Sequence, residues 1–308
     1  MVTEMNSRRT FLKQALTSTL GATLLPNTLF SMDISSSKYL ETIGLQLWTI
    51  RNEIIENPDK VLRLLNNLGY KQLEGMNIPQ VMDLKEKASA NNLAIKSSFF
   101  QWTYLTNNWE LANKKGIRKI EGINNFDALL ELAHENGLSN LTFGYLFEEE
   151  RSVEHFKKWA EALNIAGEKC KSAGITLSYH NHQFEFIEED NITPFEILEN
   201  RLDPSFVKFE LDIFWLRAAG YDPLKMMRKL DSRVDLIHLK NIKSTTNYLH
   251  QSITNDQFVT LGNGIIDINK IVKQAAKQGV KYCFVEQDHS DQPLESIKES
   301  IEWLKRNN

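Results

Sequence analysis

From residue 43 to the C-terminus, short runs rich in Val, Ile, Leu and Phe alternate eight times with segments of amphipathic helical pattern. Apolar runs of this length are typical of parallel strands that are buried on both faces. The strand–helix order excludes a β-sandwich, and eight such units close naturally into a barrel. One barrel needs about 250 residues, so the 308-residue chain has room for a single one. The sequence therefore predicts the α/β class and a (β/α)8 TIM barrel.

The expected elements follow from these runs and from the Gly and Pro residues at their ends. We expect strands at residues 43–48, 72–75, 94–99, 140–145, 175–182, 207–212, 234–238 and 282–286. We expect helices at residues 58–68, 78–91, 126–136, 153–172, 194–201, 223–230, 267–278 and 294–305. A long segment, 100–123, separates the third strand from its helix.

Residues 1–32 resemble a twin-arginine export signal, in which paired arginines precede a short hydrophobic region. Residues 7–13 read SRRTFLK, and an uncharged, modestly apolar run follows from 14 to 32. Its apolar part, residues 16–30, is too short and too polar for a stable membrane anchor. The alternative is a basic, amphipathic first helix that belongs to the fold. We expect the signal, hence export to the periplasm, with residues 33–308 forming the barrel domain.

The charge of the chain argues against a nucleic-acid partner. Its formal net charge is −4, and its 36 Lys and Arg residues form no dense basic stripe. A nucleic-acid surface needs concentrated positive charge to neutralise phosphates. We therefore expect a small-molecule substrate.

Four of the expected strands, all in the second half of the chain, end in side chains that can bind a metal: His180 with His182, Asp212, His238 and Glu286. The carboxyl ends of barrel strands meet at one face, where barrel enzymes build their active sites. Imidazoles and carboxylates together suit a divalent cation such as Mn²⁺, Zn²⁺, Co²⁺ or Mg²⁺. We expect one such ion, held by His180, Asp212, His238 and Glu286.

Three charged residues are expected to take part in catalysis. Glu286 is the expected base, Lys240 would stabilise an oxyanion, and Glu74, at the end of the second strand, would be the opposing acid. A solvated lysine is the alternative for Lys240, and a surface or helix-capping role is the alternative for Glu74. Gln287 and Asp288 are expected on the exposed side of the turn after the eighth strand.

Side chains near the same barrel face are expected to bind the substrate. Alternation along a strand puts His182 on the pocket side and Asn181 on the helix side. Glu185 follows on the next loop and could reach the site from above, as a substrate ligand or as the opposing acid. Trp215 and Trp48 offer apolar walls for a sugar ring, with core packing as the alternative for Trp215.

With these residues in place, the chain resembles the xylose isomerase-like TIM-barrel superfamily, in the branch of sugar phosphate isomerases/epimerases. The resemblance covers about residues 43–304. It rests on segments in family order: GLQLWTIR from Gly44, YHNHQFEF from Tyr179, ELDIFWLRAAGYDP from Glu210, HLKN from His238 and LGNGIIDINKIV from Leu261.

The resemblance implies a divalent metal held by Glu, Asp, His and Glu from strands five to eight. Asp212, His238 and Glu286 match the last three, while His180 stands where many members have the first glutamate. In epimerases of the family, that glutamate and the strand-eight glutamate work as acid and base on opposite faces of the substrate. A histidine pair on strand five is similar to that of inosose dehydratases in the same superfamily, which favours lyase chemistry.

We therefore expect a divalent-metal-dependent sugar isomerase or epimerase that acts through an enediolate, formed when a proton leaves the carbon next to a carbonyl. The expected substrate is a non-phosphorylated sugar or keto-sugar, because the sequence shows no obvious Arg-rich or Gly-rich phosphate cradle. Two alternatives stay open. One is a lyase or dehydratase acting on a keto-sugar or 3-keto-glycoside, and the other is a non-catalytic sugar-binding barrel.

Overall fold

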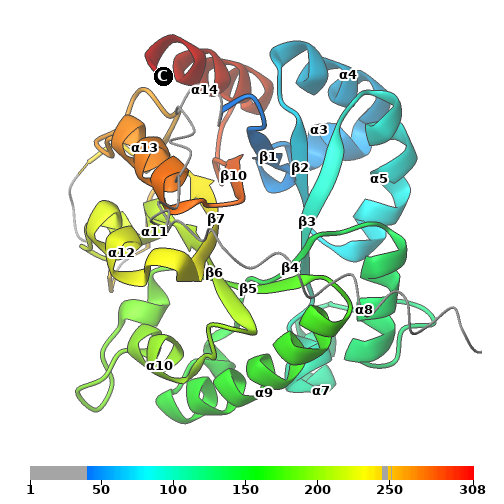
Figure 1. The fold of residues 1–308 in the computed structure, drawn as a ribbon, viewed down its shortest axis with the longest axis vertical. Coiled ribbons are helices and arrows are strands. Elements are labelled where there is room, and N and C mark those ends of the chain that lie inside the picture. The colour runs from blue at the N-terminus through cyan, green and yellow to red at the C-terminus, as the bar shows by residue number, and fades with distance from the viewer. Residues whose placement is uncertain (1–39, 245–248, 251) are drawn as a thin grey trace, which may run out of the picture. The chain divides into compact units, whose positions relative to one another are not determined.

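A computed structural model describes residues 40–244, 249–250 and 252–308. Eight parallel strands close a barrel in the order β1-β10-β7-β6-β5-β4-β3-β2, and helices surround it (Figure 1). The expected (β/α)8 TIM barrel is confirmed. The expected export signal, residues 1–32, lies outside the described residues. Within those ranges, none of the helices combines the length and the apolar character that a membrane crossing requires.

The barrel strands are short and buried. They are β1 (Gly44–Gln46), β2 (Gln72–Gly75), β3 (Ala94–Phe100), β4 (Asn140–Phe143), β5 (Thr176–His180), β6 (Val207–Asp212), β7 (Val234–Leu239) and β10 (Tyr282–Val285). The bounds of β2 and β6 match the prediction, whereas β5 ends two residues earlier than expected, so that His182 lies on the loop.

The outer helices match the prediction within two residues at each end. They are α4 (Pro58–Leu68), α5 (Ile78–Ala90), α8 (Phe126–Glu135), α9 (Val153–Ser172), α10 (Pro194–Arg201), α12 (Pro223–Leu230), α13 (Ile268–Gln278) and α14 (Pro293–Asn307). Strong end signals explain this agreement. Thr193 and Glu196 form a capping box at the start of α10, and Gly69 ends α4 with a φ of 97°.

Several short elements were not expected. The helices among them are α3 (Arg51–Glu56), α6 (Thr103–Thr106), α7 (Trp109–Lys114) and α11 (Ile213–Ala218). The 3-10 turns are η1 (Leu47–Ile50), η2 (Glu148–Glu150), η3 (Phe184–Phe186), η4 (Asp231–Arg233) and η5 (Asn255–Gln257). A small antiparallel sheet joins β8 (Asn241–Ile242) to β9 (Phe258–Val259), beyond the carboxyl end of β7.

The first strand is shorter than predicted for a local reason. The side-chain oxygen of Gln46 accepts a hydrogen bond of 2.7 Å from the backbone N–H of Trp48 and begins η1. This turn takes Trp48 out of the sheet and leaves its side chain 45% exposed at the mouth of the barrel.

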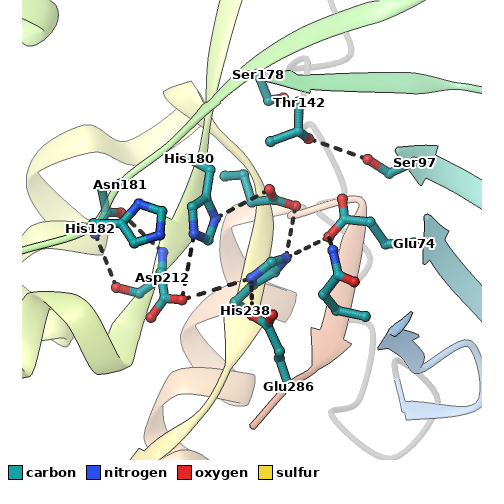
Figure 2. Close-up of polar contacts among 12 residues, drawn as sticks. Glu74, Ser97, Thr142, Ser178, His180, Asn181, His182, Asp212, His238 and Glu286 are labelled. Carbon is teal, nitrogen blue, oxygen red and sulfur yellow. Dashed lines mark hydrogen bonds and ion pairs between the residues drawn. The ribbon is translucent and has the colours of Figure 1, made fainter. Parts of the chain in front are cut away.

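The barrel interior contains a hydrogen-bonded polar layer on β3, β4 and β5. The amide group of Asn140 lies 2.8–2.9 Å from the hydroxyls of Ser97, Thr142 and Ser178. Figure 2 shows Ser97, Thr142 and Ser178 beside the histidines described below. Because buried polar groups with satisfied hydrogen bonds favour one arrangement, this layer holds three strands in fixed register under the site.

Candidate active site

The four predicted metal ligands lie at the carboxyl ends of neighbouring strands (Figure 2). His180 ends β5, Asp212 ends β6, His238 lies one residue before the end of β7, and Glu286 directly follows β10. These strands are consecutive in the barrel order. All four side chains are buried. The structure thus brings these residues together at one place.

Their ligand atoms are close enough to surround one cation. Asp212 Oδ2 lies 3.8 Å from His180 Nε2 and 3.8 Å from His238 Nδ1, and the three atoms lie within 4.8 Å of one another. Glu286 Oε2 lies 2.7 Å from His238 Nδ1. Asp212 Oδ2, His238 Nδ1 and Glu286 Oε2 are buried, and their close contacts are ion pairs with one another and with Lys240. Imidazole nitrogens and carboxylate oxygens that converge in a buried site are the ligands that divalent cations take. The residues therefore fit a divalent cation.

The chain fixes the direction of the Asp212 carboxylate. Its Oδ1 atom caps α11 by accepting hydrogen bonds of 2.9 and 3.0 Å from the backbone N–H groups of Phe214 and Trp215. This leaves Oδ2 to face the histidines. Asn181, expected on the helix side, is buried and pairs with the backbone of Asp212, whose N–H lies 3.0 Å from Asn181 Oδ1.

Lys240 is a buried cation among three carboxylates. Its Nζ lies 2.9 Å from Asp212 Oδ2, 2.7 Å from Glu286 Oε2 and 3.0 Å from both oxygens of Asp288. Burial alone would lower the pKa of Lys240, but these carboxylates hold it well above its ordinary value. Burial would likewise raise the pKa of Glu286, whereas Lys240 and His238 lower it to about 2. Lys240 is therefore charged and Glu286 ionised at neutral pH.

The two histidines on the β5 side are neutral. Burial, followed by the charge of His238, holds the pKa of His180 well below its ordinary value. Burial, followed by the charge of Lys240, lowers the pKa of His182 to about 3. A neutral imidazole keeps one lone pair, which His180 can give to a cation and His182 can use toward a substrate.

A cavity of about 690 Å³ opens above these residues. Its polar end is formed by His180, His182, Lys240, Glu286 and Asp288. The side walls are mainly aromatic, and both Trp48 and Trp215 belong to them. His182, Trp215 and Trp48, three of the predicted substrate ligands, therefore line one cavity.

Two of the residues predicted for catalysis or substrate binding do not line this cavity. Glu74 is fully buried behind His238, with its Oε2 2.6 Å from His238 Nε2. Glu185 is also fully buried, and its oxygens accept hydrogen bonds of 2.8 Å from the Tyr179 hydroxyl and the His182 backbone N–H. Burial raises the pKa of Glu185 to about 7. Both carboxylates hold parts of the site in place from outside the cavity.

Residues 59–307 match the family model of the xylose isomerase-like TIM barrel. The chain belongs to this family. A curated relative, the inosose dehydratase of Bacillus cereus (strain AH820), is 26% identical over 223 residues, which cover 68% of this chain and 74% of the relative.

Solved structures share the fold of this xylose isomerase-like barrel. A sugar phosphate isomerase/epimerase from Parabacteroides distasonis aligns with a TM-score of 0.69 at 23% identity, over 86% of this chain and 93% of its own. A xylose isomerase-like TIM barrel protein from Mycobacterium smegmatis, solved in complex with magnesium, aligns with a TM-score of 0.61 at 15% identity, over 86% and 95% of the two chains.

Glu210 is a buried site residue that the sequence reasoning missed. It lies on β6 two residues before Asp212, and its oxygens lie 3.3 Å from His180 Nδ1 and 3.2 Å from His238 Nε2. Burial and the charge of Glu74 hold the pKa of Glu210 well above its ordinary value. Glu74, Glu210 and His238 form a second group with metal-binding spacing. Side chains two residues apart on a strand point to the same side, so Glu210 shares the inward face of Asp212. A charged residue at such a buried position needs a partner, and this pattern could have identified Glu210 from the sequence.

The expectation that Gln287 and Asp288 lie on the exposed side of the turn is wrong. The side chain of Asp288 is 21% exposed and is held by Lys240. Gln287 is buried, and its Nε2 donates to the backbone oxygens of Phe258 and His289. The turn after β10 therefore adds a second carboxylate to the cavity wall.

Proposed function

We propose that this chain is a divalent-metal-dependent dehydratase that removes a proton next to the carbonyl of a keto-sugar and then eliminates water. The observation that carries the proposal is the placement of the carboxylates. Among the described residues that line the cavity, Glu286 and Asp288 are the carboxylates, and both contact Lys240 on the β10 side. Glu74 and Glu185, the expected opposing acids, are turned away from the cavity.

This placement supports elimination over epimerisation. Epimerisation needs a second acid on the opposite face of the substrate. In an elimination, Glu286 takes a proton from one carbon and can pass it to the hydroxyl on the next carbon. The protonated hydroxyl then leaves as water. One carboxylate is then sufficient.

The metal and the buried cation share the stabilisation of charge. His180, Asp212, His238 and Glu286 would hold the metal, which when bound supplies Lewis-acid polarisation of a carbonyl. Lys240 contributes its positive charge rather than a free N–H donor, because its ammonium group already contacts three carboxylates. A buried positive charge beside the cavity stabilises a substrate oxygen that gains negative charge. His182, neutral and in the cavity wall, can hydrogen-bond the hydroxyls of the sugar.

The similarity to inosose dehydratases, 26% identity for the relative from Bacillus cereus, also favours dehydration. A substrate without a phosphate group fits the cavity, because the lysine and the arginine in the cavity wall already contact other side chains. Lys240 contacts three carboxylates, and the guanidinium of Arg151 lies 3.7 Å from the centre of the Phe184 ring. The export that residues 7–13 predict would also place the protein where sugar phosphates are scarce.

Isomerisation or epimerisation is the second candidate, because His182 faces the cavity from the β5 side. In the barrel order β5 lies three positions from β10, so its imidazole could serve the opposite face of a substrate. This candidate requires His182 to donate a proton to carbon.

The test is incubation of the Mn²⁺-loaded protein with an inosose and with 3-keto-glucosides in D₂O, followed by NMR and mass spectrometry. With the inosose we expect loss of one water. With the 3-keto-glucosides we expect release of the aglycone as an alcohol, because the carbon next to the one that loses its proton carries the glycosidic oxygen, and Glu286→Gln should abolish both eliminations. Deuterium incorporation without either elimination would identify the second candidate. Absence of both exchange and elimination with every keto-sugar would leave only the sugar-binding barrel.

A further inference from the structure

A line of aromatic rings runs from the metal-binding end of the cavity to its outer wall. His180, His182, Tyr145, Phe147 and Trp102 follow one another with ring-centroid distances of 4.9, 5.4, 5.3 and 5.1 Å. All of them line the cavity. We call the three outer members, Tyr145, Phe147 and Trp102, the aromatic track. Its inner end contacts the histidine beside the reacting groups.

The aromatic track is held in place by polar partners. The indole N–H of Trp102 donates to the buried carboxylate of Glu150. The guanidinium of Arg151 lies 5.2 Å from the centre of the Tyr145 ring and 3.7 Å from that of Phe184. Cations over ring faces are attracted to them. Trp102 is buried and packs against Phe147, so a ligand would stack on Tyr145 and Phe147. Because these contacts already order the rings, little of the binding free energy is spent on fixing them.

The cavity also extends beyond the sugar that would react. A ring that reacts at Glu286 has to lie at the polar end, and it fills only part of the 690 Å³. Cavities of roughly 300–1,000 Å³ hold ligands of drug size. Tyr145 is 47% exposed in the remaining space. Exposed aromatic surface favours binding of an apolar group that removes it from water.

We propose that the aromatic track is a subsite for a planar aromatic aglycone, so that the substrate is a keto-sugar linked to an aromatic group. This inference rests on the proposed function, since a sugar reacting at Glu286 is what directs its aglycone outward. A second sugar in the same place would bring hydroxyls that need hydrogen-bond partners. Within the aromatic track the Tyr145 hydroxyl alone could serve them, because Phe147 has no polar group and the N–H of Trp102 is already bound to Glu150.

The experiment compares the binding of phenyl β-D-glucoside and methyl β-D-glucoside to the full chain by titration calorimetry. Neither compound carries the keto group, so binding is measured without turnover. We expect the phenyl glucoside to bind roughly tenfold tighter, which is what one good aromatic contact provides. Tyr145→Ala and Phe147→Ala should each remove most of this difference.

Tyr221→Ala is the matched control. Tyr221 is 38% exposed and its ring lies 4.6 Å from that of Phe186, outside the cavity, so its removal should keep the preference for the phenyl glucoside. Equal affinities in the unmodified protein, or a preference that both track variants retain, would overturn the subsite. Tighter binding of cellobiose than of the phenyl glucoside would overturn it as well. If neither glucoside binds, the subsite is overturned, whereas the proposed function is decided separately by the turnover of keto-sugars.

Discussion

The Nε2 atom of His238 lies 2.6 Å from Glu74 Oε2, on the side of the ring that faces away from Asp212. In the neutral form of the ring, a proton on Nε2 that is donated to this carboxylate leaves the lone pair of Nδ1 for a cation. Carboxylates behind metal-binding histidines commonly set the ring orientation and strengthen the ligand in this way. Glu74, expected as an acid facing the substrate, is therefore placed to support a metal ligand.

Glu74→Gln should lower the affinity for Mn²⁺ or Zn²⁺ by roughly 10- to 100-fold, because the amide keeps the size of the side chain and loses its charge. Competition with a chromophoric chelator measures this affinity. Glu185→Gln is the control, since that buried carboxylate contacts Tyr179 and the His182 backbone and touches neither metal-binding histidine. An unchanged affinity in Glu74→Gln would show that His238 needs no such support.

The protein purified without chelators should contain about one divalent ion per chain, and Asp212→Ala should lose it, as measured by elemental analysis. Asp222→Ala is a matched control because Asp222 caps α12 through the same kind of contacts, at 2.9 and 3.2 Å from two backbone N–H groups. Each substitution removes a helix cap worth about 0.5–2 kcal/mol, but only Asp212→Ala should also lose the metal. Metal retained in Asp212→Ala would exclude the proposed ligand set.

Lys240→Met should destabilise the metal-free protein by about 3–5 kcal/mol, because it leaves the buried charges of Asp212 and Glu286 without their cation. Adding Mn²⁺ should then raise the melting temperature of the variant more than that of the unmodified protein. Lys281→Met is the comparison: Lys281 pairs with Asp235 at 2.6 Å but is 53% exposed, so its loss should cost less than about 1 kcal/mol. Similar losses of stability in both variants would show that the buried carboxylates do not depend on the charge of Lys240.

The sequence was a good guide where the determining contacts are local. The helices α9, α10 and α12 and the strand β6 match the prediction to the residue because caps, glycines and apolar runs define them. The strand β5 ends early because the backbone N–H of His182 turns to a side chain three residues ahead, Glu185. An alternating pattern carries no information about such a turn.

The missed residues depend on contacts between distant parts of the chain. Asp288 follows a turn, where charged residues are usually exposed, and is partly buried because Lys240, 48 residues away, lies against it. Glu210 lies inside a strand, whereas the predicted ligands were residues at strand ends. Its contacts with His180 and His238 come from barrel closure, which brings β5 and β7 to either side of β6.

The buried carboxyl of Glu185 should make stability depend on pH in a defined window. Burial raises its pKa from 4.5 to about 7, so the folded protein holds the proton more tightly than the unfolded chain does. The free energy of unfolding contributed by this group therefore falls as pH rises from about 4.5 to about 7, by roughly 3 kcal/mol at most. Glu185→Gln, which resembles the protonated form, lacks this loss. In urea unfolding of the chelator-treated proteins, the variant should gain stability relative to the unmodified protein across that window. A difference between the two that stays constant from pH 4.5 to 7 would mean that Glu185 titrates normally in the folded protein.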